Sequence, residues 1–155
     1  MNVIDITIKI NCNIDKLWQA WTTKQGIISF FAPDCDIEIK VDGKYEIFFD
    51  ESAPYGLKGS EGVKILAIQD KKFLSFTWNA PPSIPTIRAQ RTHVALYFEK
   101  ISKNKSKLRV IHDGYGENKD WKKAFNYFEH AWGKIVLPRL KKYLEKDPAL
   151  SLIHI

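Results

Sequence analysis

The stretch that decides the fold is SKLRVIHDGYGENKDWKKAFNYFEHAWGKIVLPRLKKYLEK, residues 106–146, because the spacing of its apolar residues changes in the middle. Up to Asp113 the apolar residues alternate with polar ones, which predicts a β-strand with one buried face. Beyond Asn118 they recur at steps of three and four residues, which predicts an amphipathic helix. The apolar stripe of that helix consists of Trp121, Phe125, Phe128, Trp132, Ile135, Val136, Leu140, Tyr143 and Leu144.

The predicted helix covers residues 117–146 and would be roughly 45 Å long at about 1.5 Å per residue. Pro138 has no amide hydrogen, so we expect a kink or a split near that position. Gly133 lies in the same region and lowers the helix propensity there. The sequence therefore predicts one long terminal helix that is disturbed in its second half.

The chain begins with a strand and two short helices. Residues 3–10, VIDITIKI, alternate strictly between apolar and polar side chains, which predicts a half-buried strand. Asn13 and Thr23 are suited to be the N-caps of two short helices that follow. The second helix should end before Pro33, since the residue before a proline avoids helical geometry.

Hairpins fill the middle of the chain. The first turns at Asp42-Gly43, a dipeptide typical of tight hairpins, the second near Asp70 and Lys71, and the third at the polar stretch 103–106. A meander of this kind has one apolar face, and the terminal helix is the remaining element with a large apolar stripe. The sequence thus predicts an α+β fold. A curved antiparallel sheet of about six to seven strands wraps around a long C-terminal helix, with two short helices after the first strand.

The composition is that of an ordinary globular domain. Of the 155 residues, 45% are hydrophobic and 27% are charged, which argues against disorder. The formal net charge of +6 favours solubility and does not bear on the fold. We expect a single domain over residues 1–147 and a C-terminal tail over residues 148–155.

The number of cysteines and the hydropathy of the chain predict where in the cell the protein is located. Cys12 and Cys35 are too few for a disulfide framework or a metal set, and free thiols suit a reducing compartment. No basic segment followed by a long apolar run opens the chain, and no stretch approaches the roughly 18 consecutive apolar residues of a membrane span. These observations predict a cytoplasmic protein without a membrane span.

Five segments of the chain together resemble a known superfamily. They are IDKLWQAWTT (14–23), DG followed by KYEI (42–47), LSFTW (74–78), LRVIHDGYG (108–116) and AWGKIVLPRLKKYLE (131–145). Their order is similar to that of the START-like helix-grip superfamily (SRPBCC), and most similar to the family named for the activator of the heat-shock-protein-90 ATPase. The resemblance implies a cavity between sheet and long helix. It implies no single activity, because the superfamily includes lipid binders, cyclases, dehalogenase-like enzymes and regulators.

Large side chains on the expected inward faces would line such a cavity and would suit an apolar ligand, lipid-like or aromatic. Some of them must simply be core, and the curvature of the sheet decides which. The candidate lining residues are Phe30, Phe31, Tyr45, Phe76, Trp78, His93, Tyr97, His112, Phe125 and Phe128.

The proline-rich stretch APPSIP, residues 80–85, joins two predicted strands and should border the mouth of the cavity. Reading it as a proline-rich recognition ligand is disfavoured, because it is short and sits inside a hairpin. Arg88 and Arg91 lie beside it. They could bind a carboxylate or phosphate of a ligand, although a solvated loop explains them more simply.

No motif for metal binding or catalysis is present, and we expect no metal and no cofactor. His112 beside Asp113 could serve acid–base chemistry, but an inward histidine with its hydrogen bonds satisfied in the core is the simpler interpretation. His93 could likewise line a pocket or be an ordinary strand residue. The carboxylates of Asp34, Asp36 and Glu38 share one strand face and fit a solvated surface better than a cation site.

Three functions stay open on these grounds. The first is a binding protein for an apolar small molecule. The second is a chaperone-linked regulator that acts through protein contacts. The third is a small hydrolase or cyclase-like enzyme that uses a histidine or carboxylate in the cavity, and the missing motifs weigh against it.

The lysines near residues 100–107 lie on a hairpin tip without interleaved aromatic residues, so we expect no nucleic-acid partner. A monomer and a homodimer are both compatible with the sequence.

Overall fold

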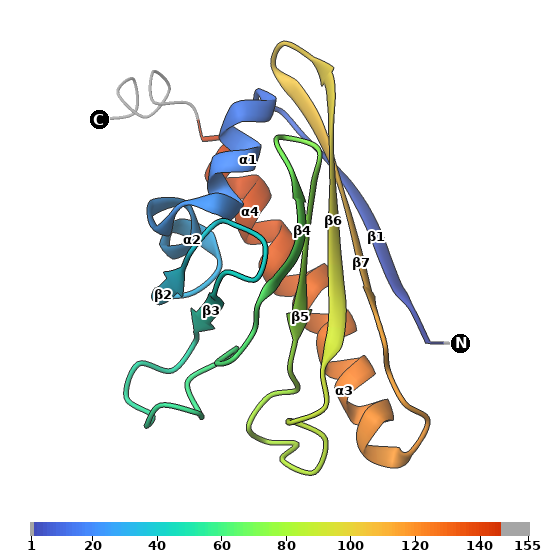
Figure 1. The fold of residues 1–155 in the computed structure, drawn as a ribbon. Helices are drawn as coiled ribbons and strands as arrows, with labels where there is room; N and C mark the ends of the chain where they lie inside the picture. The colour runs from blue at the N-terminus through green and yellow to red at the C-terminus, as the bar shows by residue number, and fades with distance from the viewer. Residues whose placement is uncertain (1, 147–155) are drawn as a thin grey trace.

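The computed structural model describes residues 2–146, so the predicted tail over residues 148–155 lies outside the described residues. A five-stranded antiparallel sheet in the order β1-β7-β6-β5-β4 forms one layer, and a two-stranded sheet of β2 and β3 lies beside it (Figure 1). The strands are β1 (Ile4–Ile10), β2 (Asp34–Ile37), β3 (Tyr45–Phe48), β4 (Ile65–Gln69), β5 (Phe73–Trp78), β6 (Thr92–Ser102) and β7 (Lys105–Asp113). The helical segments are α1 (Ile14–Thr22), α2 (Lys24–Phe30), α3 (Lys119–His130), η1 (Ala131–Val136) and α4 (Leu137–Leu144).

The seven strands of the prediction are present, but they divide between two sheets. The β2–β3 hairpin turns where expected, and Asp42 adopts a positive φ of 65° there. The isolated bridges Lys44↔Lys64 and Phe48↔Gly59 join β3 to the segment before β4, so the small sheet continues the large one only loosely. The chain leaves β3 after Phe48 and enters a long loop, which interrupts the ladder at this point.

The two short helices pack tightly against each other. The side chain of Asn13 accepts a hydrogen bond from the amide of Lys16, and Thr23 caps α2 in the same way through the amide of Gly26. A Cβ atom at Gly26 would lie 2.4 Å from the carbonyl oxygen of Gln19. Gly26 is therefore the residue that lets α2 approach the backbone of α1 this closely.

The C-terminal helix is continuous in path but changes type in its second half. A π-helical stretch, η1, separates α3 from α4 and immediately precedes Pro138. The amide of Leu137 donates to the carbonyl of Trp132, five residues earlier, which is the wider π-type spacing. This confirms the predicted disturbance near Pro138, which cannot donate the hydrogen bond that a regular α-helix would require.

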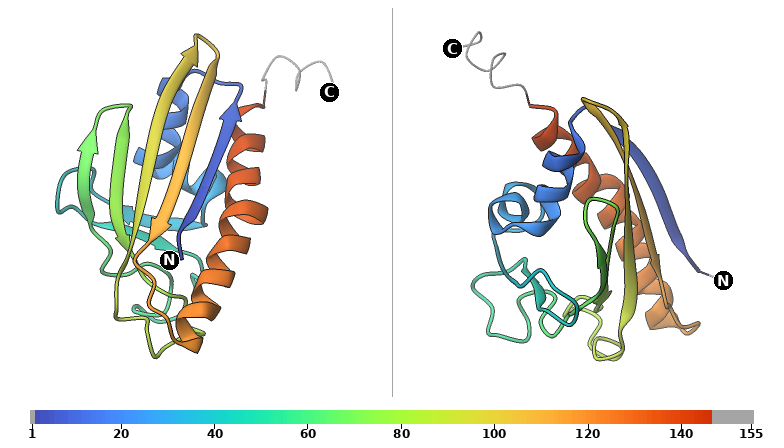
Figure 2. Two further views of the ribbon diagram at one scale, coloured as in Figure 1. Left: turned by 90° about the vertical axis from the view of Figure 1, so that its right-hand side faces the viewer. Right: turned by 45° about the horizontal axis from the view of Figure 1, so that its top comes forward.

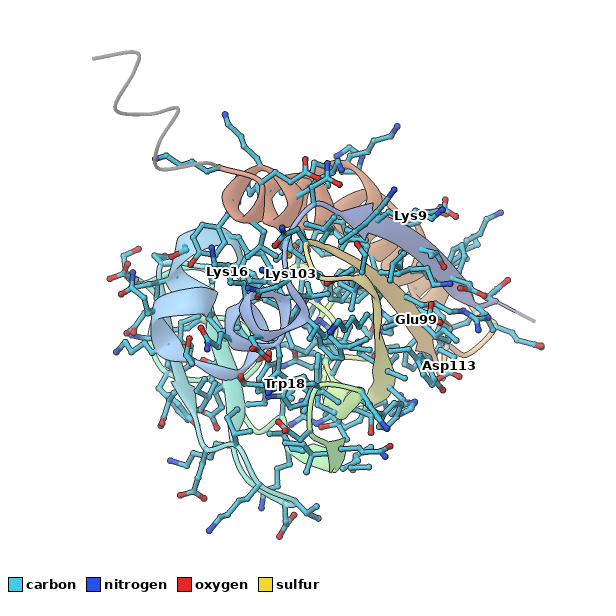
Figure 3. All side chains as sticks on the ribbon, turned by 90° about the horizontal axis from the view of Figure 1, so that it is seen from above. Lys9, Lys16, Trp18, Glu99, Lys103 and Asp113 are labelled. Atoms are coloured by element: carbon cyan, nitrogen blue, oxygen red, sulfur yellow. The ribbon has the colours of Figure 1, made fainter. Side chains whose placement is uncertain are left out.

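The C-terminal helix crosses one face of the sheet diagonally, and α1 and α2 cover the rest of that face (Figures 1 and 2). Trp132 and Leu140 are almost fully buried against it. Trp18 of α1 lies near the centre of the molecule when it is seen from above (Figure 3), and its ring meets Phe98 edge-on at 4.9 Å. The predicted α+β helix-grip arrangement is confirmed, and its interior is filled by aliphatic side chains together with many aromatic rings.

Candidate functional site

A pocket of about 390 Å³ opens at the lower end of the sheet, in the view of Figure 1. It lies between the loop that follows β3, the proline-rich loop that follows β5, and α3. We call it the loop pocket. It is lined by Phe49, Asp50, Ala53, Leu57, Lys58, Gly59, Trp78, Asn79, Pro81, Pro82, Arg88, Tyr127 and Phe128.

The loop pocket has a buried aromatic floor and an exposed apolar rim. Trp78 and Phe128 form the floor and are 3% and 6% exposed. Phe49, Leu57 and Tyr127 form the rim and are each nearly half exposed. Large apolar side chains that stay exposed around one opening mark a surface that can accept an apolar ligand.

The floor is closed from behind by further rings. Phe31 stacks on Trp78 with 6.0 Å between ring centroids, and the rim residue Phe49 meets Trp78 edge-on at 6.4 Å. Phe31 also packs against Trp132 of the C-terminal helix at 5.9 Å. These contacts separate the loop pocket from the core, so the pocket is a recess at the end of the sheet and does not run along the helix.

Two loops that border the pocket are held together by a buried ion pair. Arg88 donates to the carbonyl oxygens of Ala80, Gly56 and Gly59 at 2.5, 2.8 and 2.8 Å, and it lies 3.4 Å from the carboxylate of Glu61. The side chains of Arg88 and Glu61 are only 13% and 6% exposed. The interpretation of Arg88 as a solvated loop residue is therefore wrong, while its role as a ligand contact stays a prediction. Its guanidinium group is used to join the proline-rich loop to the loop after β3.

Glu61 stays ionised in this setting. Burial by itself would raise the pKa of Glu61, but hydrogen bonds from backbone amides, including those of Lys58 at 2.8 Å and Gly59 at 2.7 Å, lower it below its usual value. A second buried carboxylate, that of Glu46, accepts hydrogen bonds from the hydroxyl of Tyr55 and the amide of Gly62. The long loop is thus folded around two carboxylates rather than around an apolar cluster.

Few polar groups face the pocket. Asn79 is 4% exposed, and its amide nitrogen donates to the carbonyl of Gly59 at 3.1 Å. Lys58 is half-buried, and its ammonium group lies 5.7 Å from the ring of Phe48. Asp50 and Arg88 are the other lining residues with charged side chains. An apolar wall with a few polar groups at its edge suits a ligand that is mostly apolar and carries one or two polar substituents.

The structure brings only part of the predicted lining residues to this pocket. Trp78 and Phe128 line it, and Phe31 supports it from behind. Phe30, Tyr45 and Phe76 are core residues. The ring of Tyr45 packs on Phe76 at 4.5 Å, and its hydroxyl donates to the carbonyl of Trp21 at 2.6 Å.

Phe125 is half-buried on another side of the molecule, where its ring meets Tyr115 at 5.3 Å. Because large rings fill the space between sheet and helix, the predicted residues do not share one cavity.

The structure corrects the prediction that His93 and Tyr97 line a cavity between the sheet and the helix. Their neighbours Val94 and Leu96 point inward and are fully buried, so the alternation of β6 places His93 and Tyr97 on the outer face of the sheet. Tyr97 is 44% exposed and contributes to a shallow outer hollow of about 650 Å³ whose lining is mostly charged. His93 lies 3.3 Å from the carboxylate of Asp113. Neither residue lies between the sheet and the helix.

His112 has no free nitrogen for chemistry. Its Nδ1 accepts a hydrogen bond from the indole N–H of Trp132 at 3.1 Å, and its Nε2 lies 2.8 Å from the hydroxyl of Thr92. An indole N–H can only donate, so the proton of the neutral ring must sit on Nε2 and be donated to Thr92. Burial, with a smaller contribution from His93, lowers the pKa of His112 to about 3. The interpretation of His112 as a satisfied core residue fits this geometry, and acid–base catalysis does not.

Several residues of the pocket were not among the predicted lining residues. Phe49 follows the last residue of β3 and turns outward to the rim. Leu57, Asn79 and Tyr127 were not singled out at all. A usable signal was present for Tyr127, which is a large aromatic residue directly beside the apolar stripe of the helix and therefore had no place in the core.

The cysteines and the acidic strand residues that the sequence singled out lie outside the loop pocket. Cys12 and Cys35 are free and buried, and burial raises the pKa of each thiol to about 11. Asp34 pairs with Lys24 at 3.0 Å on the surface, as expected of a solvated strand face. Within residues 2–146, no three His, Cys, Asp or Glu side chains are grouped so as to hold a metal ion. None of the helices in this part of the chain has the length and apolar character needed to cross a bilayer.

Solved structures with the same fold are numerous. A protein from Mesorhizobium loti is 22% identical, with a TM-score of 0.72 over 92% of this chain and 96% of its own. The Aha1 dimer from Colwellia psychrerythraea is 20% identical, with a TM-score of 0.71 over 94% and 97% of the two chains. An HSP90 activator from Plasmodium falciparum is 15% identical, with a TM-score of 0.69 over 93% and 96%. At these identities the likeness establishes the fold alone.

No protein with curated function matches the sequence significantly. The sequence profile of the family described as "Activator of Hsp90 ATPase homolog 1-like protein" matches residues 11–145, which is most of the chain. The match includes both short helices, the strands β2 to β7 and the whole C-terminal helix. The chain therefore belongs to the Activator of Hsp90 ATPase homolog 1-like protein family.

Proposed function

We propose that this protein binds an apolar small molecule, with an aromatic or lipid-like body, in the loop pocket. The observation that carries the proposal is a recess of about 390 Å³ whose floor is made of Trp78 and Phe128 and whose rim is made of Phe49, Leu57 and Tyr127. Small-molecule sites usually have volumes of about 300–1,000 Å³ and a predominantly apolar lining with few polar groups.

The size and lining restrict the ligand. The volume is near the lower end of that range, so it suits one fused ring system or a short alkyl chain rather than a long lipid. Trp78 offers a ring face or edge for stacking, and Asn79 and Lys58 can bind one polar substituent near the mouth. The ion pair between Arg88 and Glu61 keeps both loops in place, so the pocket does not need to be assembled by the ligand.

Thermal unfolding with a panel of fatty acids, sterols, flavonoids and aromatic acids tests the proposal. A compound that binds the folded state alone raises the melting temperature in a saturable way. Ala53→Phe should narrow the pocket and Tyr127→Ser should remove part of its rim, and both should reduce the shift. Tyr97→Ser is the matched control, because Tyr97 is exposed to a similar extent on the outer face of the sheet. The proposal is wrong if no compound shifts the melt, or if all three variants reduce the shift equally.

A second candidate is a chaperone-linked regulator that acts through protein contacts. The family match and the structural likeness to an HSP90 activator support it. The assay is ATP turnover by purified Hsp90 with and without this protein, and unchanged turnover together with no complex on gel filtration would remove this candidate. The same gel filtration with light scattering distinguishes a monomer from a homodimer. A cytoplasmic location stays a prediction, based on the two free thiols.

A further inference from the structure

A second hollow, of about 600 Å³, lies on a different part of the surface, between α2 and α4. These two helices run close to each other at the upper left of Figure 1. We call the hollow the α2–α4 groove. Its floor is Phe31 and its neighbours at the end of α2, and its walls include Ile28 and Tyr143. Ile28 is 40% exposed and Tyr143 is 36% exposed, so the groove presents apolar surface that nothing in residues 2–146 covers.

One wall of the groove is strongly basic. Arg139, Lys142 and Lys146 line it, and none of its lining residues is acidic. Arg139 and Lys142 are three residues apart in α4 and lie on the same side of that helix, and Lys146 follows just beyond the end of α4 and lines the same groove. None of them forms an ion pair within the described part of the chain, whereas Lys141 on another side of α4 pairs with Glu145 at 2.7 Å.

We propose that the α2–α4 groove binds an acidic peptide segment of a partner protein, with one or two large apolar side chains inserted between the helices. Arg139 and Lys142 lie about 4.5 Å apart along the helix axis, at about 1.5 Å per residue, and Lys146 follows the end of α4, so the three cations form a row along the groove. A row of carboxylates along a peptide matches this spacing, while a single phosphate or carboxylate would meet only one or two of the cations.

The shape of the groove favours a peptide over a membrane. Its apolar residues lie in a hollow between two helices, so an inserted side chain can bury them. A bilayer surface would instead contact apolar side chains that protrude from a flat or convex face. The proposed site does not rest on small-molecule binding, because Phe49 is the only residue that lines both the groove and the loop pocket.

Charge and apolar contact should play separate roles in binding. Exposed ion pairs contribute little each and are screened by salt, with a Debye length of about 8 Å at physiological ionic strength. The cations should therefore mainly steer and orient the peptide, and the apolar insertion should hold it. We expect binding in the micromolar range that weakens when salt is added.

Fluorescence anisotropy with a synthetic peptide tests the proposal. The peptide has about 12 residues, with Glu and Leu at helical spacing, and is about 18 Å long as a helix. The matched peptide has Gln in place of every Glu. The peptide with Glu should bind at least about tenfold more tightly than the peptide with Gln, a difference that corresponds to about 1.4 kcal/mol. The double variant Arg139→Glu/Lys142→Glu should weaken binding by about tenfold or more, and Ile28→Asp should weaken it as well.

The control variant is Lys103→Glu/Lys105→Glu, which changes the net charge equally but lies at the exposed β6–β7 turn and the start of β7. It should leave binding within about twofold of the wild type. Equal loss in both double variants would show non-specific attraction and overturn the proposal, and so would absence of peptide binding. Binding to phosphatidylserine vesicles without binding to the peptide would identify a membrane site instead. Peptide binding that requires deletion of residues 147–155 would show that the chain itself occupies the groove, and the proposal would again be wrong.

Discussion

Replacing His112 by Gln should remove a large part of the acid sensitivity of this protein. In the folded state His112 is fully buried, and burial lowers its pKa to about 3. In the unfolded state its pKa returns to about 6.5. Above that value both states hold a neutral ring, and the histidine has no effect on the pH dependence of stability. Below it only the unfolded state gains the proton, so stability falls as the pH falls from about 6.5 to about 3.

The size of the effect follows from the pKa difference. Each pH unit below about 6.5 costs about 1.4 kcal/mol, so lowering the pH from about 7 to about 5 should cost about 2 kcal/mol through His112 alone. A domain has only about 5–15 kcal/mol of stability in total, so this loss should be plain in a denaturation curve. The variant should cost about 1–3 kcal/mol at neutral pH because the hydrogen bonds to Trp132 and Thr92 are disturbed, but it should lose this acid dependence.

Urea unfolding followed by tryptophan fluorescence at several pH values measures both quantities. The control is His130→Gln, which replaces an exposed histidine at the end of α3 and should keep the acid-induced loss of stability that comes from His112. Parallel curves for the wild type and His112→Gln would refute the reasoning, because they would mean that His112 gains its proton equally in the folded and unfolded states.

Three further predictions follow from packing and burial. Trp132→Ala should cost about 3–5 kcal/mol, because it removes a ring that is 2% exposed, and an unchanged urea midpoint would show that the helix does not pack as described. Gly26→Ala should cost about 1–3 kcal/mol, since its Cβ would meet the carbonyl of Gln19 at 2.4 Å, and a melting temperature equal to that of the wild type would contradict this close approach. Arg88→Met should leave the buried carboxylate of Glu61 without its cation. The variant should therefore be destabilised by about 2 kcal/mol and should be cleaved faster by proteases between residues 49 and 62. Equal cleavage rates for the variant and the wild type would mean that the ion pair does not hold these loops.

The order and type of the elements could be predicted from the sequence because they depend on local periodicity. Strict alternation over residues 3–10 and the steps of three and four residues after Asn118 each match one backbone geometry. The Asp42-Gly43 turn and the disturbance before Pro138 depend on the chemistry of single residues and were also predictable. Since the terminal helix carries the largest apolar stripe, its place across the sheet followed from the need to bury that stripe.

The location of the candidate site depended on contacts between distant segments. Phe49 continues the alternation of β3, yet it faces outward because the chain leaves the strand at Phe48 and folds around Glu61 and Glu46. Arg88 looked like a loop residue, and only the approach of residues 56–59 gives its guanidinium group buried acceptors.

The same limit applies to the predicted cavity. Periodicity shows which residues share a face of a strand, but the register and curvature of the whole sheet decide whether that face meets a void, a ring or water. For this reason His93 and Tyr97 were predicted to line a cavity between sheet and helix. In the structure they lie on the outer face of the sheet, and buried side chains fill the space on its inner face.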